Sequence, residues 1–173
     1  DALPICLGVG FYHSLIDWHH PHYTLDPVHP QSENEEALAA DKDRDFNKYV
    51  EYLHGQVEEL LTWFGKIDIL WFDFSMPGND RLPGKNKNEW QAEKLIKRIR
   101  ELQPHIILND RLGIDQDVKT PEQYQPTEWV KVDDKPVVWE ACQTFSGSWG
   151  YHRDEQTWKS LDQLVKMLID SVS

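Results

Sequence analysis

The apolar segments of this chain alternate with polar stretches in a way that predicts repeated strand-then-helix units. Short apolar runs at Ile5–Ser14 and Ile67–Phe74, rich in β-branched and aromatic residues, are typical of buried parallel strands. Over Asp45–Phe64, apolar side chains recur every three or four residues, and Gly65 stands where such a helix would end. A similar apolar stripe predicts a second helix over Asn88–Leu102.

The second half of the chain carries weaker signals of the same kind. Strands are predicted at His105–Asn109 and Pro136–Cys142, and a last amphipathic helix at Thr157–Val172. Alternating units of this length indicate an α/β fold with a parallel sheet and outer helices. Four strands are too few to close an eight-stranded barrel of roughly 250 residues. We therefore expect a partial (truncated) (β/α) TIM-like barrel, formed as a single domain by residues 1–173, or else an open parallel sheet of another kind.

A partial barrel has a consequence for assembly. It leaves two strand edges and the apolar interior of the barrel uncovered. Association with further copies of the chain would cover both, so we expect a homodimer or a higher homo-oligomer.

Charge and hydropathy exclude some classes of binding partner. Thirty acidic residues against eighteen basic ones give a formal net charge of -12, which repels nucleic acid and anionic membranes. No apolar run approaches the roughly 20 residues of a membrane-spanning helix, so no membrane partner is expected either. The first residues have no basic region and no cleavage site typical of a signal peptide. A mature or truncated chain would begin in the same way, and the compartment therefore stays unknown.

The histidines near the start of the chain raise the question of a metal site. They are His13, His19, His20, His22 and His29. No cysteine or carboxylate completes a familiar zinc or iron spacing around them. We expect them to form local hydrogen bonds in a proline-rich loop, and we expect neither a metal nor another cofactor. The two cysteines, Cys6 and Cys142, form no CxxC pair and are expected to be buried thiols.

Polar side chains stand at the carboxyl ends of the predicted strands, where parallel βα folds place their function. They are Tyr12, His13 and Asp17, then Asp73, then Asn109, Asp110 and Arg111, and finally Glu140. A single acidic residue at such a position is usually a helix cap or a loop charge. Asp73 differs because it lies inside an apolar strand, between Trp71, Phe72 and Phe74, where an unpaired carboxylate costs several kcal/mol.

Aromatic residues add a hint of carbohydrate. Of eight tryptophans, Trp18, Trp71 and Trp149 stand at or after predicted strand ends. Their faces could stack on sugar rings, although packing in the core or at a barrel rim explains any one of them equally well. Paired carboxylates facing a cleft with aromatic walls, without a metal constellation, point to glycoside hydrolysis.

Five segments resemble signatures of the family 29 glycoside hydrolases, the α-L-fucosidases, and they occur in family order across nearly the whole chain. They are GFYHSLIDWHHP (Gly10–Pro21), IDILWFDF (Ile67–Phe74), LNDRLG (Leu108–Gly113), VKTPEQYQP (Val118–Pro126) and WEACQTFSGSWGYH (Trp139–His152). The resemblance implies a retaining α-L-fucosidase that hydrolyses fucosylated oligosaccharides or glycoconjugates by double displacement.

The resemblance also implies roles for individual residues. Asp73 matches the nucleophile. Glu122 matches the acid/base of several members of the family, with Glu140 as its competitor. Substrate-binding positions are matched by Tyr12, His13, Trp71 and Arg111, and Trp149 is expected to contact sugar as well. Carboxyl groups of retaining pairs lie about 5–5.5 Å apart, and we expect that separation for Asp73 and Glu122.

The chain also departs from the family pattern. His13 stands where the family usually has a second tyrosine, and Phe74 where a small residue is common. The family's earlier barrel strands, its closing glycine-rich strand and its C-terminal β-sandwich have no counterpart. Two alternatives stay open: a weak or inactive sugar-binding remnant, and an exo-glycosidase for another sugar. The family is typically secreted, periplasmic or lysosomal.

Overall fold

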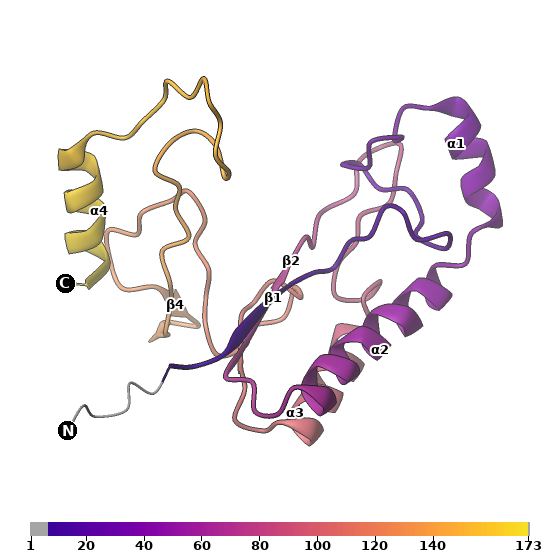
Figure 1. Ribbon diagram of the computed structural model, residues 1–173, viewed down its shortest axis with the longest axis horizontal. Coiled ribbons are helices and arrows are strands. Elements are labelled where there is room, and N and C mark those ends of the chain that lie inside the picture. Colours follow the sequence, from indigo (N-terminus) through magenta and orange to yellow (C-terminus); the bar gives the residue numbers. More distant parts are fainter. Residues whose placement is uncertain (1–6, 173) are drawn as a thin grey trace. The chain divides into compact units, whose positions relative to one another are not determined.

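The computed structural model describes residues 7–172 (Figure 1). By its internal contacts the chain divides into two compact units, Asp1–Asp115 and Gln116–Ser173, and each is described by itself below. The expected single domain over residues 1–173 stays a prediction. Within the described residues, no helix has both the length and the apolar character needed to cross a membrane.

The first unit is built on a small parallel sheet with the order β1-β2-β3. Its strands are β1 (Gly10–Ser14), β2 (Ile69–Asp73) and β3 (Ile107–Leu108). The expected first strand was longer, but Ile5 and Cys6 lie outside the described residues. The parallel pairing confirms the α/β fold class.

Two helices lie side by side along one face of this sheet (Figure 1). They are α2 (Phe46–Trp63), whose first turn is capped by the Asp45 carboxylate, and α3 (Ala92–Leu102). Both were predicted from their apolar stripes. Their buried stripes consist of Tyr49, Val50, Leu53, Val57 and Leu61 on α2 and of Ala92, Leu95 and Ile99 on α3. The second helix begins later than predicted, because residues 87–91 form turns that end at Gln91, where φ is +49°.

The sheet has one covered and one open face. Leu70, Phe72 and Leu108 are fully buried in the core with the helices. Side chains alternate along a strand, so their neighbours point the other way. Accordingly Ile69 and Ile107 are about two-fifths exposed. A parallel sheet is normally covered on both faces, so this exposed apolar face is unusual, and the expected partial barrel stays a prediction.

The sequence did not predict α1 (Glu35–Ala40) or the short 3-10 turn that follows it, η1 (Asp41–Asp43). The Asn34 side chain accepts hydrogen bonds from the N–H groups of Glu36 and Ala37 and so caps the start of α1. No residue of this helix is buried. It therefore has no apolar stripe that a sequence pattern could reveal.

The second unit holds α4 (Leu161–Val172), which lies within the predicted last helix, and a small antiparallel hairpin. The hairpin strands are β4 (Lys131–Val132) and β5 (Lys135–Pro136). Asp133 and Asp134 have φ of +49° and +62°, as a tight two-residue hairpin turn requires.

The predicted strand Pro136–Cys142 was wrong. Its first residue belongs to the hairpin, and the remainder makes only two single-residue parallel pairings, Lys119 with Trp139 and Glu122 with Cys142. The bonds of a parallel ladder are present on either side of Pro121, for example from Cys142 N–H to the Pro121 carbonyl at 3.0 Å. Proline has no N–H to donate in return to Glu140, so the ladder is interrupted there.

Candidate active site

Asp73 ends β2, and hydrogen bonds orient both of its carboxylate oxygens. The Tyr12 hydroxyl donates to Oδ2 at 2.9 Å. The Arg111 guanidinium donates to Oδ1 at 3.2 Å, and the backbone N–H of Phe74 donates to the same oxygen at 2.9 Å. The side chain keeps 23% of its surface exposed. Asp73 is therefore an accessible, charge-paired carboxylate and not an unpaired one inside an apolar strand.

Trp71 forms an aromatic platform beside this carboxylate. Its indole is stacked with the Tyr12 ring at a centroid distance of 5.6 Å. The Arg111 guanidinium lies 5.0 Å from the indole centroid, a cation–π arrangement. Tyr12, Trp71, Asp73 and Arg111 come from three separate segments, and the structure brings all four together. This is the geometry expected where the carboxyl ends of parallel strands meet.

Asn109 supports Asp73 from the neighbouring strand. The backbone pairing of β3 ends at Leu108, and the Asn109 side chain continues it. Its Oδ1 accepts from the Phe72 N–H at 3.0 Å, and its Nδ2 donates to the Phe72 carbonyl at 2.8 Å. Because Asn109 is only 2% exposed, this clamp fixes the backbone immediately before Asp73.

Ser75 ties the Arg111 segment to the start of α3. Its hydroxyl donates to the Arg111 carbonyl at 2.6 Å and accepts from the indole N–H of the fully buried Trp90 at 3.0 Å. The sequence analysis assigned no role to Ser75 or to Asn109. The only signal for Asn109 was its place among the polar residues at a strand end, and Ser75 gave none.

Phe74 has a strained backbone directly after Asp73. Its φ is +78°, a region that non-glycine residues rarely adopt, and the residue is 40% exposed. Glycine adopts this conformation without strain, whereas residues with a Cβ do not. The same conformation directs the Phe74 N–H to Asp73 Oδ1.

His13 lies beside the core and not beside Asp73. It is paired with Phe72 in the strand register, and the two rings are 5.8 Å apart. Burial lowers the pKa of His13, which favours the neutral ring. Its expected role in substrate binding stays a prediction.

Glu122, Glu140 and Trp149 belong to the second unit, whereas Asp73 belongs to the first. Both glutamates are exposed, and the pairing of Glu122 with Cys142 places them on adjoining segments two residues out of register. Trp149 is 61% exposed. The separation of about 5–5.5 Å expected between Asp73 and the acid/base stays a prediction.

Two of the loop histidines form local hydrogen bonds as predicted, whereas His22 Nδ1 accepts from the N–H of Asp45, 23 residues away, at 3.4 Å. His20 Nδ1 accepts from the His22 N–H at 3.2 Å, and His29 Nδ1 accepts from the Gln31 N–H at 3.0 Å. Among the described residues, no three histidine, cysteine or acidic side chains gather as metal ligands would. Cys142 is half-buried, so the expectation of a buried thiol was wrong there, and Cys6 lies outside the described residues.

Comparison with known proteins decides the family. Residues 6–173 match the model of the family described as Alpha-L-fucosidase. The chain belongs to the α-L-fucosidase family. It is similar to α-L-fucosidase isoenzyme 1 from Paenibacillus thiaminolyticus, with 43% identity and a TM-score of 0.80 over 95% of this chain and 40% of that one.

Two further relatives show how much of a fucosidase the chain spans. It is 26% identical to the plasma α-L-fucosidase of Rattus norvegicus, covering 96% of this chain and 34% of the rat protein. It shares the fold of a GH29 α-L-fucosidase from Bacteroides thetaiotaomicron, at 23% identity and a TM-score of 0.67, covering 94% of this chain and 38% of that one. The chain thus spans between a third and two-fifths of these fucosidases.

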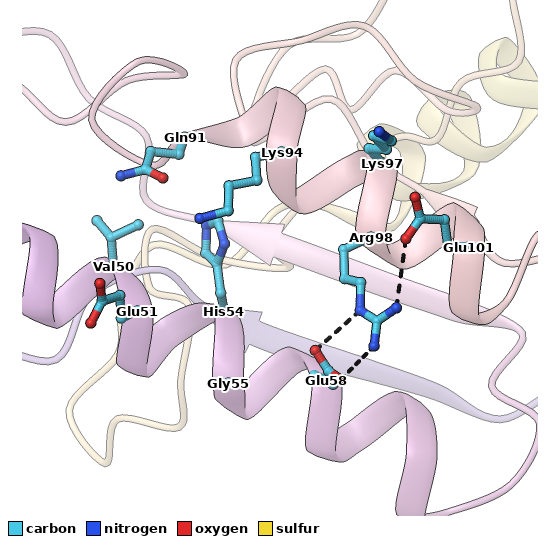
Figure 2. Close-up of a pocket in the computed structure, with 10 residues that line it drawn as sticks. All are labelled: Val50, Glu51, His54, Gly55, Glu58, Gln91, Lys94, Lys97, Arg98 and Glu101. Carbon is cyan, nitrogen blue, oxygen red and sulfur yellow. Dashed lines mark hydrogen bonds and ion pairs between the residues drawn. The ribbon is translucent and has the colours of Figure 1, made fainter.

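A groove between α2 and α3 is the other notable feature of the first unit (Figure 2). Arg98 of α3 crosses it and donates to both Glu58 carboxylate oxygens, at 2.5 and 3.1 Å, and it also pairs with Glu101 at 3.6 Å. These side chains are about half exposed, so the ion pairs add little to stability. None of the residues matched to fucosidase function lines this groove.

Proposed function

We propose that this chain carries the nucleophile of a retaining α-L-fucosidase, and that its sheet is part of a (β/α) barrel. The observation that carries the proposal is the geometry of Asp73. Its two oxygens are oriented by Tyr12 and Arg111 next to the Trp71 face, at a strand end in a chain of the α-L-fucosidase family. This arrangement suits a carboxylate that must attack from one direction.

In the proposed reaction, an Asp73 oxygen attacks the anomeric carbon of the fucoside. Glu122 protonates the glycosidic oxygen as its bond to that carbon breaks, which leaves a fucosyl ester on Asp73. Glu122 then removes a proton from water, the water attacks the same carbon, and the ester bond breaks. Two displacements release fucose with its configuration retained. Tyr12 and Arg111 hold the carboxylate, and the Trp71 face is available to stack on the sugar.

The proposed substrate is a fucosylated oligosaccharide or glycoconjugate. A structure of the Lactobacillus casei enzyme, which shares the fold at 21% identity and a TM-score of 0.61, is described as a complex with α-L-fucose as product. A sugar-binding remnant with weak or no activity stays the second candidate. Hydrolysis of another sugar is the remaining alternative, and a panel of aryl glycosides separates it from fucoside hydrolysis.

The decisive test is hydrolysis of 4-nitrophenyl α-L-fucoside by the wild type and by Asp73→Ala, with azide added to the variant. We expect wild-type turnover, loss in the variant, and formation of fucosyl azide of inverted configuration when azide replaces the missing carboxylate. A folded wild-type protein without turnover would favour the sugar-binding remnant.

Azide rescue also tests which glutamate is the acid/base. With azide, Glu122→Ala is expected to give fucosyl azide of retained configuration, because Asp73 still forms the ester and azide needs no base to attack it. Glu140→Ala is the matched control and is expected to show no azide rescue. The opposite pattern would assign the role to Glu140.

We also propose that further copies of the chain, as a homodimer or a higher homo-oligomer, cover the open face of the sheet. The exposed Ile69 and Ile107 side chains on that face support this proposal. Light scattering at several concentrations measures the mass, and a stable monomer at all of them would contradict it.

A further inference from the structure

The side chain of Lys85 is buried in the first unit, although folded proteins almost always leave lysine in water. The residue is only 2% exposed. Its ammonium group donates to the Thr24 hydroxyl at 2.9 Å and lies 4.6 Å from the centroid of the Phe46 ring and 5.8 Å from that of Tyr23. Two aromatic rings and a hydroxyl thus form a cage around the ammonium group. Burying an ammonium group is costly, so its position needs a physical explanation.

Carboxylates around the cage favour the charged form of Lys85. Burial lowers the pKa of the ammonium group, whereas the nearby charges of Asp26, Asp41 and Glu89 raise it. Asp26 is itself fully buried and accepts a hydrogen bond from the Tyr23 hydroxyl at 2.5 Å. The charged form is also the one that the ring faces attract. The cage therefore suits a cation, and a neutral side chain of the same length would not replace it.

The cage joins the loops that follow β1 and β2. Thr24 belongs to the segment after β1, whereas Lys85 ends a loop of residues 76–85 after β2. Met76 and Lys85 close this loop with two backbone hydrogen bonds, at 2.8 and 3.0 Å. A Cβ at Gly78 would lie 2.6 Å from a backbone N atom of the opposite arm, so the two arms are in close contact. The position of this closed loop is set by the place where the Lys85 side chain is held.

The loop is connected to the candidate active site through Ser75 and Trp90. Ser75 directly precedes the loop, and its hydroxyl donates to the Arg111 carbonyl at 2.6 Å. The backbone N–H of Trp90 donates at 3.0 Å to the carbonyl of the residue after Lys85, and its indole N–H donates to the Ser75 hydroxyl at 3.0 Å. Arg111 in turn donates to Asp73. Both ends of the loop therefore lead to the hydroxyl that holds the Arg111 segment.

We propose that Lys85 is a positioning residue for the Asp73 site. Its ammonium group fixes the loop of residues 76–85, the loop fixes Ser75, and Ser75 fixes the segment from which the Arg111 guanidinium reaches Asp73. This inference rests on the function proposed for Asp73. The simpler explanation is a cation that only stabilises the core, and it predicts no local change in the Arg111 segment when the ammonium group is removed.

The test combines backbone amide exchange with kinetics on the whole chain. Lys85→Met removes the ammonium group at nearly the same length. We expect hydrogen–deuterium exchange of residues 76–85 and 109–113 to become about tenfold faster, as for the loss of one hydrogen bond from a charged group. For 4-nitrophenyl α-L-fucoside, kcat per folded molecule is expected to fall about tenfold while KM stays within about threefold, because the carboxylate is misdirected and the sugar contacts remain.

Two further variants separate positioning from general stability. Lys85→Arg keeps a cation that can stack on the rings, and it is expected to restore exchange and kcat to within about threefold of the wild type. Arg81→Met is the matched control, because it breaks the ion pair of the same loop with Glu35, at 2.6 Å, in which both side chains are largely exposed. An exposed pair contributes little, so exchange and kcat are expected to stay within about twofold of the wild type.

Thr24→Val decides the question if Lys85→Met does not fold. It removes only the hydroxyl that accepts from the ammonium group, and it is expected to give the same changes at about threefold. Unchanged exchange of residues 109–113 in the folded variants, or equal changes in the matched control, would overturn the proposal. So would an impaired Lys85→Arg together with an unaffected Thr24→Val. A wild type without turnover would refute the reaction proposed for Asp73, whereas exchange of residues 109–113 would still decide whether Lys85 holds that segment.

Discussion

The side-chain amide of Asn109 forms two hydrogen bonds with the backbone of Phe72, accepting from its N–H at 3.0 Å and donating to its carbonyl at 2.8 Å. An asparagine side chain thereby replaces one step of the β3 strand. It holds the residue before Asp73 in the strand conformation, so the direction of the Asp73 carboxylate depends on a side chain that binds the backbone of its neighbour.

Asn109→Ala is expected to lower the free energy of unfolding by about 2–3 kcal/mol, because two polar backbone atoms of the core lose their partners. Urea denaturation measures the loss. The control is Asn79→Ala, since exposed Asn79 also accepts from two backbone N–H groups, those of Arg81 and Leu82. Its cost is expected to stay below about 1 kcal/mol because water replaces the lost bonds. Equal losses in the two variants would show that burial of the Asn109 clamp contributes nothing.

Tyr12→Phe removes the hydroxyl that donates to Asp73 Oδ2 while keeping the ring on Trp71. If Asp73 is the nucleophile, kcat/KM for 4-nitrophenyl α-L-fucoside is expected to fall about tenfold or more, since hydrogen bonds to charged groups contribute about 1.5–3 kcal/mol. Tyr52→Phe on α2 serves as the control, because its hydroxyl only accepts from Gln56. A similar fall in both variants would assign no special role to the Tyr12 hydroxyl.

Phe74→Gly is expected to raise the free energy of unfolding by up to about 1 kcal/mol, because glycine adopts positive φ without the strain that a side chain brings. The reverse change is available at Gly65, where φ is +76° and a new Cβ would meet open space. Gly65→Ala is expected to cost about 1 kcal/mol through backbone strain alone. Guanidinium denaturation compares the two, and a destabilised Phe74→Gly would mean that packing of the ring outweighs the strain.

Burial lowers the pKa of His54 below its usual 6.5, and its Nε2 lies 2.9 Å from the Trp90 carbonyl. The folded state therefore favours the neutral ring, and the unfolded chain binds the proton first as pH falls. The stabilisation is complete above about pH 6.5 and is lost progressively below it. Urea midpoints between pH 7.5 and 5.0 are expected to fall, and His54→Gln is expected to reduce this slope. The substitution is not expected to abolish the slope, because His13 and His29 also have lowered pKa values. An unchanged slope in His54→Gln would contradict the assignment.

The parts of the fold that bury a continuous apolar pattern could be predicted from the sequence. The β2 strand and the α2 and α3 helices belong to this group, since burial and periodicity coincide in them. The α1 helix buries nothing and was missed. The strand predicted at Pro136–Cys142 failed because its partner segment contains Pro121, a fact about pairing that no local pattern records.

Some residues of the candidate site could likewise be predicted from the sequence, and others could not. Tyr12, Trp71, Asp73 and Arg111 could be expected together because parallel strands present their carboxyl ends at one edge, although their roles in catalysis stay predictions. The hydrogen bonds of Asn109 and Ser75 join residues 37 and 36 positions apart in the chain. They depend on strand register and helix placement, which become known only with the folded structure.

Pro121 leaves one gap in the backbone pairing beside Glu122. Four backbone hydrogen bonds hold residues 119–123 to residues 138–142, and the missing step is the one that Pro121, without an N–H, does not donate. A change beside Asp73 instead disturbs the sheet, the Asn109 clamp and the core under Phe72. A residue with an N–H at position 121 would therefore extend an existing ladder, whereas a change beside Asp73 reaches into the core.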